Sequence, residues 1–177
     1  MTDLKVRIEK LPRMWVASVL ASGETPEAEA WRRLRQWAIP KGLLSDSDRH
    51  PIFGFNNPNP SSDRKEYGYE LWIRVDAPEA GEDAAALKKF EGGLFAVTAC
   101  RLHGDPDIVT TWRLLWDCVQ GGPYRWRRAQ ELERVLNPNA TEDELVLELY
   151  LPIEENEAPP ESRNDANLVQ TTRESVN

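Results

Sequence analysis

The feature that most constrains the fold of this chain is an internal repeat. Segments of the first half resemble segments of the second half in the same order, with an offset of about eighty residues that becomes slightly shorter toward the end. The matching pairs are TPEAEAWRRLRQWAIPKG (25–42) with PDIVTTWRLLWDCVQGG (106–122), RMWVASVLASGE (13–24) with GLFAVTACRLHGD (93–105), and YELWIRVDAP (69–78) with DELVLELYLP (143–152). Self-similarity at a fixed spacing indicates a duplicated structural unit.

Each half predicts the order strand, helix, strand, strand from its hydrophobic periodicity. The first half has predicted strands near 4–20, 51–56 and 66–75, and a helix from about 26 to 41. The second half has predicted strands near 87–102, 125–136 and 144–152, and a helix from about 106 to 120. Two such units can merge their strands into one antiparallel sheet. We therefore expect an α+β fold with pseudo-two-fold symmetry, both helices on one face of the sheet and a ligand groove on the other.

The chain of 177 residues is of a length that predicts one domain. We place this domain at 1–153, with halves at about 1–80 and 81–153. Residues 154–177 are acidic, contain prolines and have few large apolar groups. Such a composition cannot bury enough apolar surface to order itself, so we expect a flexible tail there.

Alternation along the strands predicts which side chains lie on the helix-free face. In the last strand one side carries leucine only, at 145, 147, 149 and 151, and we assign that side to the helices. The opposite face then collects Phe53, Phe55, Trp72, Val135 and Tyr150, together with Glu70, Glu133 and Glu148. Sheet twist makes such a face concave, and concave aromatic surfaces with few polar groups are typical of small-molecule sites. The alternative is a merely solvated strand face.

The second predicted helix carries an apolar stripe that includes Trp112 and Trp116. Most of each indole ring is expected to pack in the core, with an edge of each ring exposed to the groove. A carboxylate in a partly desolvated aromatic cleft favours a flat cation, because charge attraction strengthens as water is excluded and the rings add a cation–π term. The same desolvation raises the pKa of a glutamate, which makes it a candidate general acid or base.

Composition excludes several other classes of function. The net charge of −8 argues against a nucleic-acid partner, because phosphate neutralisation needs a basic face. No apolar run approaches membrane-spanning length and the N-terminus lacks a signal-peptide core, so we expect a cytoplasmic protein with no membrane contact. Cys100 and Cys118 are interpreted as reduced, buried thiols. His50 and His103 belong to no metal or triad motif, and no phosphate-binding glycine loop is present, so neither a metal nor a cofactor is expected.

Four segments, YGYELWIRV (67–75), FEGGLFAVTACRLHGDPDIVTTWRLLWDCV (90–119), ELERVLNPN (131–139) and LELYLPI (147–153), carry a resemblance to a known family. With the N-terminal unit they extend it over roughly residues 3–153. The sequence resembles the GyrI-like small-molecule-binding family, which also occurs as the effector-binding domain of AraC-type and MerR-type regulators. The resemblance implies a central ligand groove in which Glu133, from a segment like Glu-x-Tyr-Leu, meets lipophilic cations. Val135 stands where that pattern has tyrosine, and Tyr150 is the nearest substitute for its hydroxyl.

Three functions remain open from the sequence. The first is polyspecific binding of flat aromatic or lipophilic cationic small molecules, in toxin or drug protection or sensing, with the groove residues named above as the ligand-binding set. The second is hydrolysis of cyclopropanoid genotoxins, with Glu133 and Tyr150 as the catalytic pair. The third is a protein-interaction module such as a gyrase-protecting protein. No DNA-binding module precedes residue 4, so we expect a stand-alone member of the family.

Overall fold

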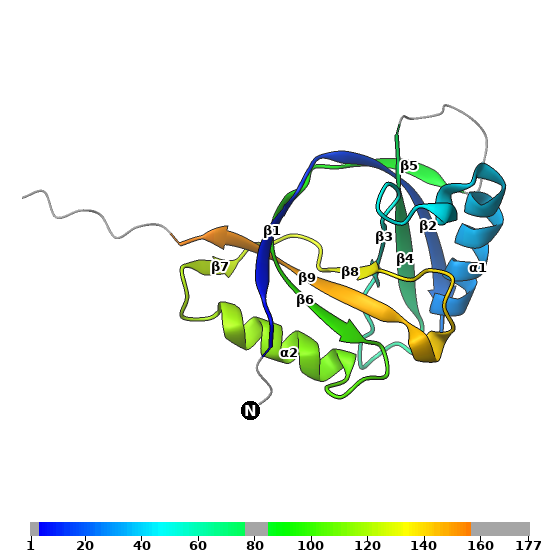
Figure 1. Cartoon of the computed structure of the whole chain (residues 1–177). Coiled ribbons are helices and arrows are strands. Elements are labelled where there is room, and N and C mark those ends of the chain that lie inside the picture. The colour runs from blue at the N-terminus through cyan, green and yellow to red at the C-terminus, as the bar shows by residue number, and fades with distance from the viewer. Residues whose placement is uncertain (1–3, 77–84, 157–177) are drawn as a thin grey trace, which may run out of the picture.

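The computed structural model describes residues 4–76 and 85–156 (Figure 1). It confirms the predicted α+β fold, a curled antiparallel sheet with two helices built from a duplicated unit. The last strand continues to Glu155, which shortens the predicted tail from its N-terminal end. The rest of that predicted tail, 157–177, lies outside the described residues.

The first half contains β1 (Arg7–Leu11), β2 (Met14–Gly23), α1 (Glu27–Ala38), the short 3-10 helices η1 (Ile39–Lys41) and η2 (Leu43–Ser45), β3 (Ile52–Asn56) and β4 (Tyr67–Val75). The second half contains β5 (Ala86–Phe90), β6 (Gly93–Arg101), α2 (Ile108–Val119), β7 (Tyr124–Trp126), β8 (Leu132–Val135), the 3-10 helix η3 (Glu142–Glu144) and β9 (Val146–Glu155). Three strands predicted as single segments are each broken in two. Pro12 marks the first break, because proline cannot donate to a ladder, and Gly92, with φ of 75°, marks the second.

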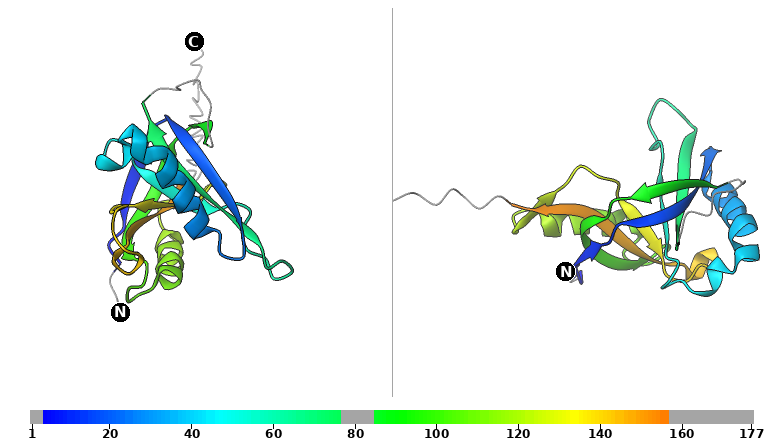
Figure 2. Two further views of the ribbon diagram at one scale, coloured as in Figure 1. Left: turned by 90° about the vertical axis from the view of Figure 1, so that its right-hand side faces the viewer. Right: turned by 90° about the horizontal axis from the view of Figure 1, so that it is seen from above.

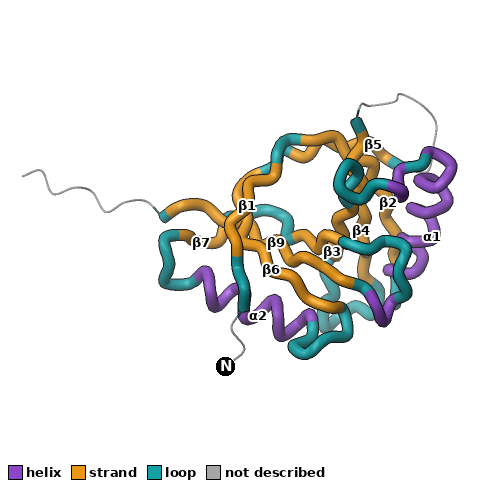
Figure 3. Tube along the Cα trace, viewed as in Figure 1, coloured by secondary structure: helices purple, strands orange, loops and turns teal. Residues whose placement is uncertain are grey.

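The strands form one sheet in the order β1-β6-β9-β8-β3-β4-β2-β5, with β7 also paired to β9. The two halves meet at its centre, where β3 pairs with β8. At the two ends of this order, β1 of the first half pairs with β6 of the second, and β5 of the second half pairs with β2 of the first. Each half therefore contributes one edge strand to the other half. Because β1 leads directly into β2 and β5 into β6, these pairings curl the sheet back on itself (Figures 1 and 3).

Both helices cover the outer face of this curl, as predicted (Figures 1 and 2). Ala30, Leu34 and Ala38 of α1 are fully buried against β2 and β4. The predicted stripe of α2 packs against β6 and β9, with Leu115 fully buried and Trp112 and Trp116 partly buried. Cys100, next to this layer, is partly buried, whereas Cys118 is exposed, so its prediction as a buried thiol is wrong.

The inner face of the curl is filled by an aromatic core. Its rings form a chain of edge and tilted contacts, Phe53–Tyr150, Tyr150–Phe95, Phe95–Phe90, Phe90–Trp72 and Trp72–Phe55, with centroids 4.7–6.4 Å apart. Phe53, Phe55 and Tyr150 are 1%, 5% and 0% exposed, so side chains occupy the space between the ribbons. These three residues lie on the helix-free face as expected, but the curl closes over them and makes that face a second core.

Candidate functional site

Glu133 and Val135 lie on the helix-covered face, and their predicted position beside Trp72 is wrong. Gly54 of β3 pairs with Glu133, whereas its neighbour Phe53 pairs with Trp72. Since successive residues of a strand point to opposite faces, Glu133 and Trp72 point apart. The pattern of apolar residues could not show which face of β8 carries Glu133, because the strand has buried apolar residues on both faces. Leu132 packs in the inner core and Val135 packs under α2.

Glu133 receives hydrogen bonds from both halves of the chain. The Trp112 indole N–H of α2 donates to Oε1 at 3.3 Å, and the Tyr69 hydroxyl of β4 donates to Oε2 at 3.2 Å. Within the described residues Glu133 forms no ion pair. A carboxylate held by two neutral donors, with no cation beside it, keeps its attraction for a positively charged ligand.

Burial raises the pKa of Glu133 above its usual range, and the negative charges of Glu27 and Glu131 add to this rise. The hydrogen bonds from Trp112 and Tyr69 oppose it without cancelling it. Burial also raises the pKa of Glu131. Glu133 and Glu131 therefore lie close to the seam between the halves, where β3 pairs with β8, and burial makes both carboxylates costly to keep ionised without a cation.

Aromatic side chains from α1 and α2 lie on the same helix-covered face as Glu133. Trp31 of α1 packs against the buried clusters of both halves, and Trp112 is its repeat-related counterpart on α2. At the N-terminus of α1, the Tyr67 hydroxyl donates to Glu27 at 2.5 Å. The site thus combines aromatic rings, which can make cation–π contacts, with carboxylates, which attract a positive charge.

Gly54 explains how Tyr69 reaches Glu133. A Cβ at position 54 would overlap the Tyr69 hydroxyl and crowd its ring. The absence of a side chain on β3 therefore leaves the space through which Tyr69 crosses toward β8. Sequence reasoning missed Tyr69, although a signal existed. It immediately precedes Glu70, so alternation placed it on the helix side of the segment YELWIRV.

The remaining predicted acids belong to the inner core and are neutralised there. Glu70 is fully buried and accepts hydrogen bonds from Ser18 at 2.5 Å, from the Trp72 indole at 2.6 Å and from Asn57 at 2.7 Å, in addition to an ion pair with Lys88. Although burial pushes the pKa of Glu70 upward, these partners hold it below its usual range.

Glu148 and Tyr150 also lie inside the curl. Glu148 pairs with Arg7 at 2.8 Å and with Arg134 at 3.7 Å, and the Tyr150 hydroxyl donates to it at 3.1 Å. Tyr150 points to the face opposite Glu133 and does not join it. Trp116 stacks on Trp126 of β7, with ring centroids 5.8 Å apart, and makes no hydrogen bond to Glu133. Among the described residues, Trp112 is the one member of the predicted set that hydrogen-bonds to Glu133, and Val135 and Trp116 lie on the same helix-covered face. The other members lie together inside the curl: Phe53, Phe55, Glu70, Trp72, Glu148 and Tyr150.

Residues 4–76 and 85–156 hold neither a metal-binding cluster nor a membrane-spanning helix. This part of the chain contains no group of three or more His, Cys, Asp or Glu side chains arranged to hold a metal ion. No helix in it is long and apolar enough to cross a membrane.

Comparison with known proteins identifies the fold. Residues 4–154 match the family model of the GyrI-like small molecule binding domain. The C-terminal domain of EcmrR is similar, with a TM-score of 0.61 and 11% identity over 86% of this chain and 99% of that one. The structure of SAV2435 bound to tetraphenylphosphonium is also similar, with a TM-score of 0.56 and 14% identity over 85% of this chain and 94% of that one. A protein from Listeria innocua described as a hydrolase has a TM-score of 0.60 and 16% identity over 85% of this chain and 92% of that one. A search of curated proteins found no match.

Proposed function

The chain belongs to the family of GyrI-like small-molecule-binding domains, and on that premise we propose that it binds flat aromatic or lipophilic cations at Glu133. The proposed role is protection against, or sensing of, cationic drugs and toxins. The ligand would lie at the seam between the two halves, against Trp112 and Tyr69, with its positive charge toward Glu133.

One observation carries this proposal: the Glu133 carboxylate is partly buried against the rings of Trp112 and Tyr69 and has these two neutral hydrogen-bond donors but no cationic partner among the described residues. An arriving cation would recover the electrostatic energy that burial costs this group. A hydrophilic cation such as Na⁺ would lose its own hydration without gaining ring contacts. A large, weakly hydrated organic cation therefore fits best.

One structural relative supports the same ligand class. SAV2435, which shares this fold, was solved with tetraphenylphosphonium, a bulky lipophilic cation. Identity to SAV2435 is 14%, so the proposed ligand class rests on the carboxylate and rings of this chain itself.

The direct experiment is a fluorescence titration of the full chain with tetraphenylphosphonium and with ethidium, read from tryptophan emission. We expect saturable quenching at micromolar concentrations and at least tenfold weaker binding in Glu133→Gln, because the variant removes the charge that attracts the cation in a partly desolvated site; a tenfold change corresponds to about 1.4 kcal/mol. Glu142→Gln removes an exposed carboxylate from η3 and is the charge-matched control. Equal affinity in both variants, or no quenching by any cation in a varied panel, would refute the proposal.

A second candidate function is hydrolysis of cyclopropanoid electrophiles at the same site. The observation that favours it is the raised pKa of Glu133 together with the Tyr69 hydroxyl at 3.2 Å. A protonated Glu133 could donate to the carbon that leaves the strained ring, while water adds to the electrophilic carbon and loses its own proton. Tyr69, on the same face as Glu133, takes the assisting role assigned to Tyr150 from sequence.

Product analysis separates the two functions. Incubating a cyclopropane-bearing genotoxin with the protein should give a ring-opened product heavier by one water, and Glu133→Gln should abolish its formation. Recovery of the unchanged compound after incubation with a stoichiometric amount of protein would reject hydrolysis and leave binding as the remaining function. A protein partner captured equally well by the wild type and Glu133→Gln would instead favour an interaction module.

A further inference from the structure

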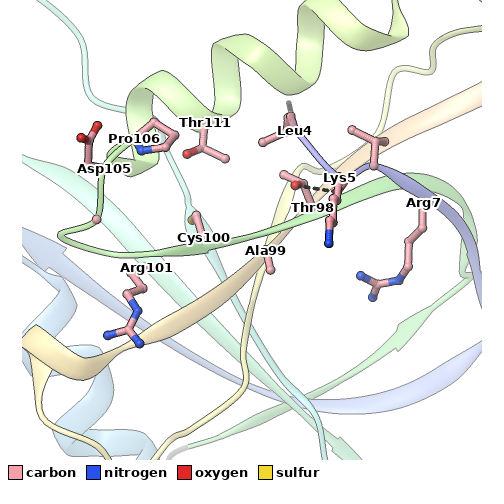
Figure 4. A pocket seen from close by; sticks show the side chains of 12 residues that line it. Leu4, Lys5, Arg7, Thr98, Ala99, Cys100, Arg101, Asp105, Pro106 and Thr111 are labelled. Atoms are coloured by element: carbon pink, nitrogen blue, oxygen red, sulfur yellow. Dashed lines mark hydrogen bonds between the residues drawn. The ribbon is translucent and has the colours of Figure 1, made fainter. Parts of the chain in front are cut away.

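A separate hollow of about 550 Å³ lies at the outer end of β6, on the opposite side of that strand from β9 (Figure 4). The strand β1 pairs with β6 only as far as the contact between Arg7 and Val97. Beyond it the N-terminal segment 4–6 diverges, held by a hydrogen bond of 3.0 Å from the Thr98 hydroxyl to the Lys5 carbonyl. The volume of this hollow is within the usual range of small-molecule sites.

The divergence leaves the backbone of β6 unpaired on one edge. The Leu102 N–H donates to Leu145 on the β9 side. Because N–H groups alternate between the two edges of a strand, those of Ala99 and Arg101 point away from β9, into the hollow. In the described part of the chain neither N–H has a backbone acceptor, and Ala99 is exposed. Free backbone N–H groups at a strand edge are ready donors to an anion.

The side chains around the hollow are mainly basic, so they favour an anion as the backbone N–H groups do. Lys5, Arg7 and Arg101 line it, against a single acid, Asp105. The three basic side chains lie on one side of the β6 ribbon, away from α2 (Figure 4). Arg7 is occupied by Glu9 and Glu148, whereas Lys5 and Arg101 form no ion pair within residues 4–76 and 85–156. Lys5 and Arg101 thus supply two basic groups against one carboxylate at this hollow, in a chain whose net charge is −8.

The remaining lining is largely apolar. Leu4, Val6 and Pro106 line the hollow beside α2. A ligand that satisfies both parts needs an anionic head for the basic edge and a small apolar body for this lining. The geometry points to a second binding site here, for a small organic carboxylate, independent of the Glu133 site and of opposite charge preference.

The test uses 2-naphthoate as the probe and its neutral counterpart 2-naphthamide as the matched ligand control, with the full chain followed by amide NMR. We expect naphthoate to shift the Ala99 and Arg101 amide signals saturably. The double variant Lys5→Gln with Arg101→Gln should weaken binding roughly tenfold, because two charge-assisted contacts are lost. Arg13→Gln, which removes an exposed arginine paired with Glu91 at another end of the sheet, should leave it unchanged, as should Glu133→Gln.

Several results would overturn this second site. Equal affinity for naphthamide would show that charge plays no part. Equal weakening by Arg13→Gln would indicate a nonspecific response to total charge. Shifts centred on Trp112, or no saturable shift, would show that the hollow holds no carboxylate. Failure of the cation proposal for Glu133 would leave this result unaffected, since the two sites share neither charges nor probes.

Discussion

Glu133 and Trp72 point to opposite faces of the sheet, although both pair with β3 at adjacent residues, Gly54 and Phe53. This relationship divides the acids of the protein into two environments. Inside the curl, Glu70 and Glu148 are matched by basic side chains. On the helix-covered face, Glu133 has only neutral donors among the described residues. The unmatched carboxylate is therefore where a cation gains most.

The first prediction concerns the cost of keeping Glu133 ionised. Its pKa is raised in the folded protein, so the native state binds a proton more readily than the unfolded chain and loses stability as pH rises through that pKa. Glu133→Gln removes this cost and should raise the free energy of unfolding at pH 7 by roughly 0.5–2 kcal/mol, as functional-site replacements commonly do. Urea denaturation at pH 7 and at pH 4 measures this. A variant less stable than the wild type at pH 7 would contradict it.

The second prediction concerns the pH dependence of cation binding. Binding requires ionised Glu133, so affinity should fall as pH falls through the raised pKa of this group, before ordinary exposed carboxylates protonate. Tetraphenylphosphonium titrations at a series of pH values give the midpoint. Tyr69→Phe removes a donor that lowers this pKa, so its midpoint should move to higher pH. A midpoint identical in Tyr69→Phe and the wild type would separate Tyr69 from the site.

The third prediction uses Gly54 to move Tyr69 without changing it. The methyl group of Gly54→Ala would overlap the Tyr69 hydroxyl, and the phenol ring must shift away from Glu133. Cation affinity should therefore fall about as much as in Tyr69→Phe. The double variant should show little further loss, because both changes remove the same contact, that of the Tyr69 hydroxyl with Glu133. Additive losses in the double variant would mean that Gly54 acts through something other than Tyr69.

The fourth prediction separates the inner core from the binding site. Glu70→Gln breaks the ion pair with Lys88 and disturbs the hydrogen bonds of a fully buried group, so it should lower the free energy of unfolding by roughly 1–3 kcal/mol. Since the pKa of Glu70 is lowered in the folded protein, this stabilisation is present above its unfolded pKa and is lost as pH falls through the folded pKa. Cation affinity of the folded variant should match that of the wild type. A large loss of affinity would place Glu70 in the ligand site.

Most of the fold could be predicted from the internal repeat in the sequence. Matching Trp31 with Trp112 fixed two equivalent units, and the leucines of β9 correctly identified the helix-covered side. What the sequence could not show was closure, because the pairing of β1 with β6 and of β2 with β5 depends on where two long strands bend. Closure turned an expected open groove, with Phe53 and Tyr150 in its wall, into a core.

The site was only partly predictable for a related reason. Alternation assigns a face only when one side of a strand is polar. In β8 both sides are buried, with Leu132 inside the curl and Val135 under α2, so alternation gave no basis for choosing a face and Glu133 was expected on the wrong one. The family resemblance identified Glu133 as central without regard to its face. Its donor Tyr69 emerged only from the pairing of β3 with β4 and β8.

The central claim, that a cation binds at the helix-covered seam, is tested most directly by the indole N–H signals of Trp112 and Trp72. These two groups donate to Glu133 and Glu70 on opposite faces of the sheet. Addition of tetraphenylphosphonium should shift the Trp112 indole signal saturably and leave the Trp72 signal nearly unchanged. A saturable shift of Trp72 with Trp112 unmoved would contradict the account and return the site to the inner face.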